Sequence, residues 1–145
     1  MSGNDCQVDF YLLKSPGLDA RHLACRLSLM AWERGHRVTV VTEDDQQASA
    51  LNELMWESPA GRFLPHDVAD PGTDQPAPVT ITTLQGLNDA EVVINLCAGP
   101  LPEPARFSRL LEIVPQAGPG LEASRDKFRY YRGQGLEPAA HDISK

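Results

Sequence analysis

The stretch that decides the fold is residues 8–41, VDFYLLKSPGLDARHLACRLSLMAWERGHRVTVV. Residues 8–13 form a short apolar run of strand-forming side chains. Residues 18–34 have the apolar spacing of a helix, which Gly35 is well placed to end. Residues 38–41 form a second apolar run. A strand, a helix and a strand joined by short loops predict two parallel strands with a crossover helix.

The first predicted helix has one apolar side that we expect to be buried. Leu23, Leu27 and Met30 line it, and Cys25, Leu29 and Trp32 widen it. Residues 43–58 predict a second helix, with an acidic first turn that suits the positive end of a helix dipole. Its buried stripe is expected to consist of Ala48, Leu51, Leu54 and Met55, and Trp56 is expected in the core rather than at an interface.

The rest of the chain continues the pattern after a long proline-rich connection at residues 59–78. Further strands are predicted at residues 79–82, 92–96 and 110–114, and residues 110–114 are expected to be the last strand along the chain. A short helix is predicted around residues 103–109 and a final helix at residues 121–134. Residues 135–145 are predicted to be a polar tail. The sequence therefore predicts one domain over residues 1–145, an α/β fold with a doubly wound, mostly parallel sheet flanked by helices.

Composition narrows the class of protein. The chain has 145 residues and a formal net charge of −7, which argues against a general nucleic-acid-binding surface. Its three cysteines are far apart, which favours free thiols, a reducing compartment and therefore the cytoplasm. No apolar run approaches the length of a membrane span.

Catalytic and nucleotide-binding motifs are not found. The turn after the first predicted strand has one glycine, Gly17, and the chain has no P-loop and no G-x-S-x-G segment. The four histidines have no ligand partner at a recognised spacing, so we expect neither a metal nor a cofactor. Cys97 follows a predicted strand, where α/β enzymes place catalytic groups, but a structural thiol is the more common case. These absences predict a protein that is not itself an enzyme.

A basic stripe near the C-terminus is the strongest functional signal. Arg125, Lys127, Arg129 and Arg132 fall within residues 124–133, and on a helix Arg125, Phe128, Arg129 and Arg132 share one face. Guanidinium groups beside an aromatic ring suit an anionic partner that also carries an apolar or aromatic group. The alternative is a solvated basic helix face without a partner.

Several stretches in order resemble one family, the chi subunit of bacterial DNA polymerase III. They are Asp9-Phe-Tyr-Leu-Leu13, Glu33-Arg-Gly-His-Arg-Val38, Glu43-Asp-Asp-Gln-Gln-Ala48, Leu54-Met-Trp56, Phe63-Leu-Pro-His66 and Phe128-Arg-Tyr-Tyr-Arg132. The resemblance implies a Rossmann-like fold without nucleotide chemistry. It also implies two partners, the psi subunit of the clamp loader and the C-terminal tail of single-stranded DNA-binding protein, so that DNA is contacted only indirectly. Some members of the family also partner a repair helicase.

The resemblance also implies where the tail binds. Its pocket falls on Val114 and, within the stripe that ends at Arg132, on Arg125, Phe128 and Arg129, with Phe63 as a further apolar wall. From the residues alone, Phe63 either docks the proline-rich loop or lines a groove. The family pattern often has Tyr and Lys at positions 128 and 129, so this chain lacks one hydroxyl and gains a guanidinium.

Two other functions remain as alternatives. One is a small α/β enzyme or nucleotide binder that uses the strand ends near residues 14–17 and Cys97, against which the missing phosphate motifs count. The other is direct DNA binding through the stripe, against which the acidic net charge counts.

Overall fold

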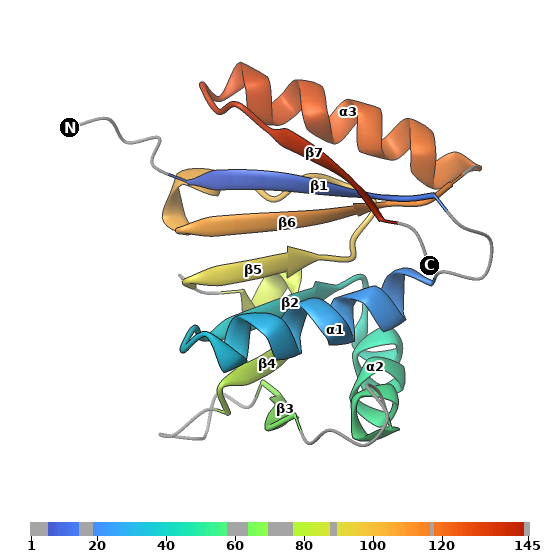
Figure 1. Ribbon diagram of the computed structural model, residues 1–145, viewed down its shortest axis with the longest axis vertical. Coiled ribbons are helices and arrows are strands. Elements are labelled where there is room, and N and C mark those ends of the chain that lie inside the picture. The colour runs from blue at the N-terminus through green and yellow to red at the C-terminus, as the bar shows by residue number, and fades with distance from the viewer. Residues whose placement is uncertain are drawn as a thin grey trace.

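The computed structural model describes residues 6–14, 19–57, 64–69, 77–87, 90–116 and 118–143. Its elements are β1 (Gln7–Leu13), α1 (Ala20–Glu33), β2 (Val38–Thr42), α2 (Asp45–Glu57), β3 (His66–Val68), β4 (Val79–Thr83), η1 (Leu84–Gly86), β5 (Val92–Asn95), η2 (Pro104–Arg106), β6 (Arg109–Val114), α3 (Pro119–Gly133) and β7 (Ala139–Ile143). The strands form one sheet in the order β3-β4-β2-β5-β6-β1-β7, and every pairing in it is parallel (Figure 1).

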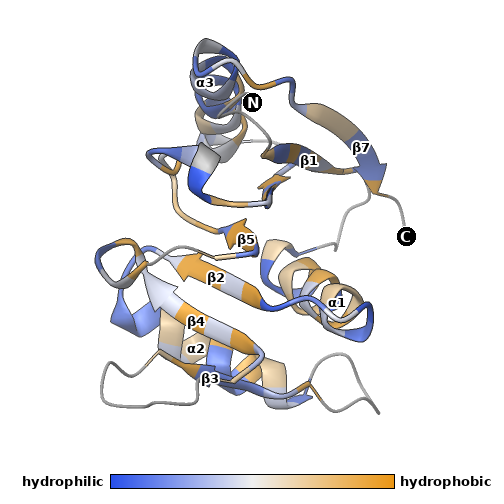
Figure 2. Ribbon diagram, turned by 90° about the vertical axis from the view of Figure 1, so that its left-hand side faces the viewer, coloured by the Kyte–Doolittle hydropathy of each residue, from blue (hydrophilic) through white to orange (hydrophobic). Residues whose placement is uncertain are grey.

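Helices cover both faces of this sheet, as the sequence predicts for a doubly wound fold. The helices α1 and α2 pack against one face, and α3 packs against the other (Figure 2). Each face has its own buried apolar cluster, the first centred on β2, β4 and β5 and the second on β1, β6 and α3. The central strand β5 is buried along its whole length, and its residues 92–94 read as a continuous apolar run rather than an alternating one.

The C-terminal segment differs from the prediction of a polar tail. Residues 139–143 form β7, which pairs in parallel with β1 from Asp9↔Ala139 to Leu13↔Ile143. The side chains of β7 are exposed except for Ile143, which is half-buried, so this strand carries no apolar pattern that the sequence could reveal. The last strand along the chain is therefore β7 and not β6, which corrects the prediction.

Three shorter predictions also need correction. The helix expected around residues 103–109 is only the single turn η2, and Arg109 already begins β6. The short strand β3 was not predicted at all. Ala48, Leu51 and Met55 are buried as expected, but Trp56 is 61% exposed, with its ring centroid 4.6 Å from that of His66.

The prediction for Met30 also needs correction, because this side chain is 44% exposed rather than buried. The buried residues of α1 run from Leu23 to Leu29 and include Ala24 and Ser28 near the middle of the arc. Small side chains there let the helix axis lie close to the sheet, and the larger apolar residues flank them. Met30 falls beyond the edge of this arc at about 100° per residue.

A buried carboxylate ties β7 to the rest of the sheet. Asp9 on β1 has no exposed surface, and its oxygens lie 3.1 Å from Gln7 Nε2, 2.9 Å from Arg109 Nε and 2.8 Å from His141 Nε2. The ring of Tyr11 stacks on His141 at 5.2 Å. Burial alone would raise the pKa of Asp9, but the hydrogen bonds from His141, Arg109 and Gln7 outweigh it and lower the pKa.

We predict that Asp9→Asn destabilises the fold in a pH-dependent way. Because the folded state lowers the pKa of Asp9, its stabilising contribution is complete above the ordinary Asp pKa and is lost as the pH falls through the folded value. The substitution should cost about 1.5–3 kcal/mol at neutral pH and less at pH 3, which lies below the ordinary Asp pKa. Urea unfolding at both pH values measures this. Asp142→Asn on exposed β7 is the control, and an equal loss from Asp9→Asn at both pH values would contradict the assignment.

Candidate partner-binding site on helix α3

Local sequence signals set the ends of α3. Gly118 has φ 92°, a left-handed conformation that favours glycine, and Pro119 follows it in the first turn, where a missing N–H costs nothing. Glu122 lies in the first turn and Arg132 in the last, so both complement the helix dipole. Gly135, with φ 86°, donates its N–H to Arg132 O and ends the helix.

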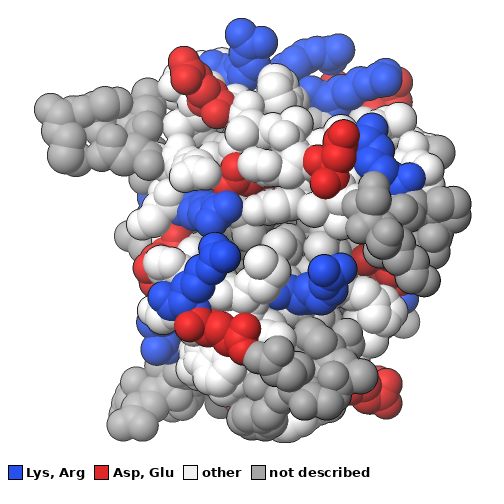
Figure 3. Space-filling view, in the orientation of Figure 1, with Lys and Arg blue, Asp and Glu red and all other residues white. Residues whose placement is uncertain are grey.

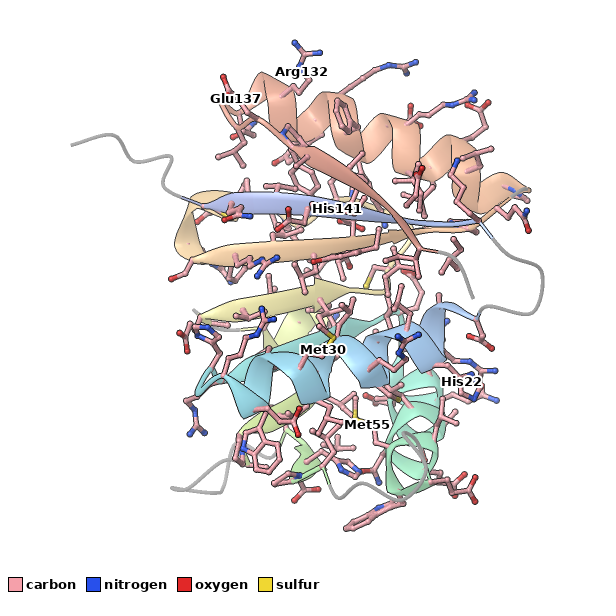
Figure 4. The ribbon with its side chains drawn as sticks, in the orientation of Figure 1. His22, Met30, Met55, Arg132, Glu137 and His141 are labelled. Atoms are coloured by element: carbon pink, nitrogen blue, oxygen red, sulfur yellow. The ribbon has the colours of Figure 1, made fainter. Side chains whose placement is uncertain are left out.

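The outer face of α3 carries the predicted arginines. Arg125, Arg129 and Arg132 are all exposed, and Figure 3 shows the basic side chains gathered along the edge of the molecule that α3 forms. Arg132 points away from the sheet into solvent (Figure 4). It makes no ion pair with any residue that the structure describes. The structure therefore brings these three side chains together on one face, as the helical spacing predicts.

An apolar floor lies beside these arginines. Phe128 is half-buried, with its ring centroid 5.3 Å from that of Phe10 on β1. Both belong to the apolar cluster that also contains Val114 at the end of β6 and Tyr131. Val114 and Phe128 therefore share one apolar cluster, and the tail pocket itself stays a prediction. Phe63, the other predicted wall, lies outside the described residues.

Lys127 lies on the inner side of the same helix and is only 5% exposed. Its Nζ donates to Glu112 Oε1 at 2.8 Å and to Cys97 O at 2.6 Å. It therefore adds no charge to the exposed face. It belongs to the helix–sheet contact instead.

Glu112 on β6 is the centre of this buried network. Besides Lys127, it accepts hydrogen bonds from Tyr131 Oη at 2.6 Å and from Asn95 Nδ2 at 2.8 Å. Burial raises the pKa of Glu112, and Lys127, Tyr131 and Asn95 oppose this shift by stabilising the carboxylate. Tyr131 Oη also accepts from Leu101 N at 3.0 Å. The network thus fixes α3 to β5, to β6 and to the loop after β5.

A cavity of about 490 Å³ lies where β2, β4 and β5 end, the edge of a parallel sheet at which enzymes of this fold class bind ligands. Its lining includes Cys97, Thr83 and three acids, Glu43, Asp44 and Asp45. Burial raises the pKa of Cys97 to about 11, so the thiol is protonated at neutral pH, which supports the structural role favoured from the sequence. No described group of three or more His, Cys, Asp and Glu is placed to hold a metal ion.

Two of the three acids in this cavity have structural roles. Asp44 Oδ1 accepts from Gln47 N at 2.8 Å and so caps the first turn of α2. Glu43 Oε2 accepts from Ala98 N at 2.9 Å and so ties the end of β2 to the loop after β5. The helix-start interpretation of this acidic run is therefore supported for Asp44.

One glycine spacing with chemical meaning was missed by the sequence reasoning. Gly118-Pro-Gly-Leu-Glu-Ala123 matches G-x-G-x-x-A and leads from β6 into α3, where a dinucleotide-binding loop would sit. The local structure explains why both positions are glycine. Gly118 has positive φ, and a Cβ at Gly120 would lie 2.6 Å from the Pro115 ring. Glu122 in the first turn also disfavours a phosphate at that helix end.

The fold and this site define an α/β protein with an exposed arginine–aromatic helix face beside an apolar cluster. A family model described as DNA polymerase III chi subunit, HolC, matches residues 6–139. DNA polymerase III subunit chi of Pseudomonas aeruginosa is 33% identical over 140 residues, covering 96% of this chain and 98% of that protein. The subunit of the same name from Escherichia coli is 31% identical over 134 residues, covering 88% and 91%. The chain belongs to the chi subunit family of DNA polymerase III and is thus an accessory protein of DNA replication.

Solved structures with little sequence identity share the fold. The crystal structure of T4 UvsW has a TM-score of 0.72 at 7% identity, covering 97% of this chain and 42% of that one. Saccharomyces cerevisiae Dbp5 bound to RNA and ADP BeF3 has a TM-score of 0.65 at 11% identity, covering 96% and 42%. At such identities the likeness concerns the fold alone. None of the described helices has the length and apolarity of a membrane span.

We predict that the buried ion pair is essential to the seating of α3. Lys127→Met leaves Glu112 buried without its cation and should cost about 3–5 kcal/mol in urea unfolding. Adding Glu112→Gln to Lys127→Met should recover a large part of that loss, because an uncompensated buried charge is then no longer present. A single variant as stable as wild type, or a double variant no more stable than the single one, would show that the pair does not hold the helix.

Proposed function

We propose that this chain is a non-catalytic adaptor that connects the psi subunit of the clamp loader to the C-terminal tail of single-stranded DNA-binding protein. The observation that carries the proposal is the outer face of α3, where three exposed arginines flank the half-buried ring of Phe128. Membership of the chi family supports it, because a replication accessory protein needs protein-binding surfaces more than chemistry.

The resemblance to this family implies a tail that ends in aspartates and a terminal phenylalanine, and each part has a counterpart on this chain. Arg125 and Arg129 are exposed and offer guanidinium forks for carboxylates. Phe128 and Val114 belong to one apolar cluster, against which an aromatic side chain gains by edge or offset stacking. A peptide that presents a ring and a carboxylate on the same residue would use both features together.

The second surface of the adaptor lies at the other end of the sheet. Trp56 at the end of α2 and Val68 on the edge strand β3 are exposed large apolar residues, 61% and 37% accessible. The helix α2 and strand β3 lie at the end of the molecule opposite α3 (Figure 1). Exposed apolar side chains beside the edge strand of the sheet, as far as the described residues show it, suit a permanent protein partner. We assign this surface to psi.

The proposal includes the absence of catalysis by the chain itself. Cys97 is held as a neutral thiol, and Asp44 caps a helix. Glu112 is fully engaged with Lys127, Tyr131 and Asn95. These groups are of the types that enzymes use, but here each has a structural role.

For the tail site, we predict that Arg125→Ala and Arg129→Ala each weaken binding of an acidic peptide ending in Phe by about 1.5–3 kcal/mol. Wild-type affinity should be micromolar, about −8 kcal/mol, and should fall with added salt because the arginines are exposed. Phe128→Ala should also weaken binding through lost aromatic burial. Calorimetric titration measures all three variants.

The matched control is Arg26→Ala, which removes one exposed arginine from α1 on the other side of the sheet. It should leave the titration unchanged. Binding by Arg129→Ala as tight as that of wild type at low salt would make the outer face of α3 a solvated helix surface and would overturn the site.

For the second surface, we predict that Trp56→Ala weakens the complex with psi by at least about 2 kcal/mol, as expected for a central aromatic residue of an interface. The same variant should bind the tail peptide normally, and Arg129→Ala should show the reverse pattern. Co-purification and calorimetry with psi measure this. Leu84→Ala, at an exposed apolar residue of η1, is the control. Loss of both partners in either variant would contradict a model with two separate surfaces.

A further inference from the structure

Two acids alternate with the arginines on the outer face of α3. Arg125 Nη1 lies 3.2 Å from Glu122 Oε1, and Arg129 Nη1 lies 3.1 Å from Asp126 Oδ1. In both pairs the acid stands three residues before the arginine, and both partners are well exposed. Figure 3 shows acidic atoms beside the basic side chains at this edge of the molecule. Two of the three arginines are therefore already neutralised by their own helix.

These pairs are not needed to hold the helix in place. Exposed ion pairs contribute little to stability, because water screens them and two long side chains must be ordered. The position of α3 is fixed instead from its inner side, by Lys127 and Tyr131 on Glu112. The two acids are therefore not required for stability, and their main effect is on the binding of ligands to the outer face.

Their effect depends on the kind of ligand. A polyanion such as single-stranded DNA gains affinity from each phosphate that a cation neutralises, through release of counterions. Here Glu122 and Asp126 compete for the same guanidinium groups and repel the phosphates, so a polyanion gains little affinity. A peptide with a terminal aromatic residue also gains from the apolar cluster at Phe128, which the acids do not compete for. The acids therefore weaken charge-only ligands more than ligands with an apolar anchor.

We propose that Glu122 and Asp126 are specificity-determining residues that prevent the arginine face of α3 from binding single-stranded nucleic acid. This selectivity matters for a replication protein, since it works beside exposed DNA strands. The part of the inference that concerns the tail rests on the proposed function. The part that concerns nucleic acid does not.

The test is the double variant Glu122→Gln/Asp126→Asn, titrated at low salt with a fluorescent oligo-dT of about 16 nucleotides and with the acidic peptide ending in Phe. The variant should bind the oligonucleotide at least about tenfold more tightly than wild type, with a steeper dependence on salt. Its affinity for the peptide should rise only a few-fold. Glu53→Gln/Glu57→Gln, on exposed positions of α2, is the control with the same change in net charge.

A triple variant that adds Arg129→Ala should lose the gain in oligonucleotide binding. The inference is overturned if the double variant binds the oligonucleotide no better than wild type, if the α2 control gains as much, or if the triple variant keeps the gain. A double variant that gains oligonucleotide binding while no protein form binds the peptide would support the inference on nucleic acid and refute the proposed tail site.

Discussion

The buried ion pair between Lys127 and Glu112 is the interaction on which the orientation of the outer face of α3 depends. It joins the inner side of α3 to β6, and through Tyr131 and Asn95 the same carboxylate holds the loop that follows β5. A buried pair of this kind is weak evidence for stability, because desolvation offsets much of the attraction. The ion pair instead sets the orientation of the helix, because only one rotation of α3 about its own axis places Lys127 against Glu112. That rotation turns Arg125 and Arg129 outward and Phe128 toward Phe10.

The parallel sheet then acts as a rigid spacer between two different surfaces. At one end α3 presents arginines over an apolar cluster, and at the other α2 and β3 expose Trp56 and Val68. The first suits a charged peptide that binds and leaves, and the second suits a partner that buries apolar area. Such a division fits the proposed adaptor role, in which psi stays bound while the tail is exchanged.

Much of the fold can be predicted from the sequence, because residues 8–41 already contain a strand, a helix and a strand with short connections. The outer face of α3 can also be predicted, since four residues at helical spacing define it. Strand β7 cannot, because its side chains are exposed and it is fixed through His141 and Asp9, which lie far apart along the chain. The sequence likewise cannot show that Lys127 points inward to Glu112. The prediction that Trp56 lies in the core is wrong, because it follows the apolar character of the side chain and not its position on α2.

The place where the tail peptide contacts the protein is the most direct test of the proposed adaptor role. Titration of ¹⁵N-labelled protein with the acidic peptide ending in Phe, followed by amide chemical shifts, locates that contact without any substitution. We expect the largest shifts at residues 125–132 of α3 and at Val114 at the end of β6, with residues of α2 and β3 unmoved. Shifts concentrated around Trp56 and Val68, or along the ends of β2, β4 and β5, would contradict the account.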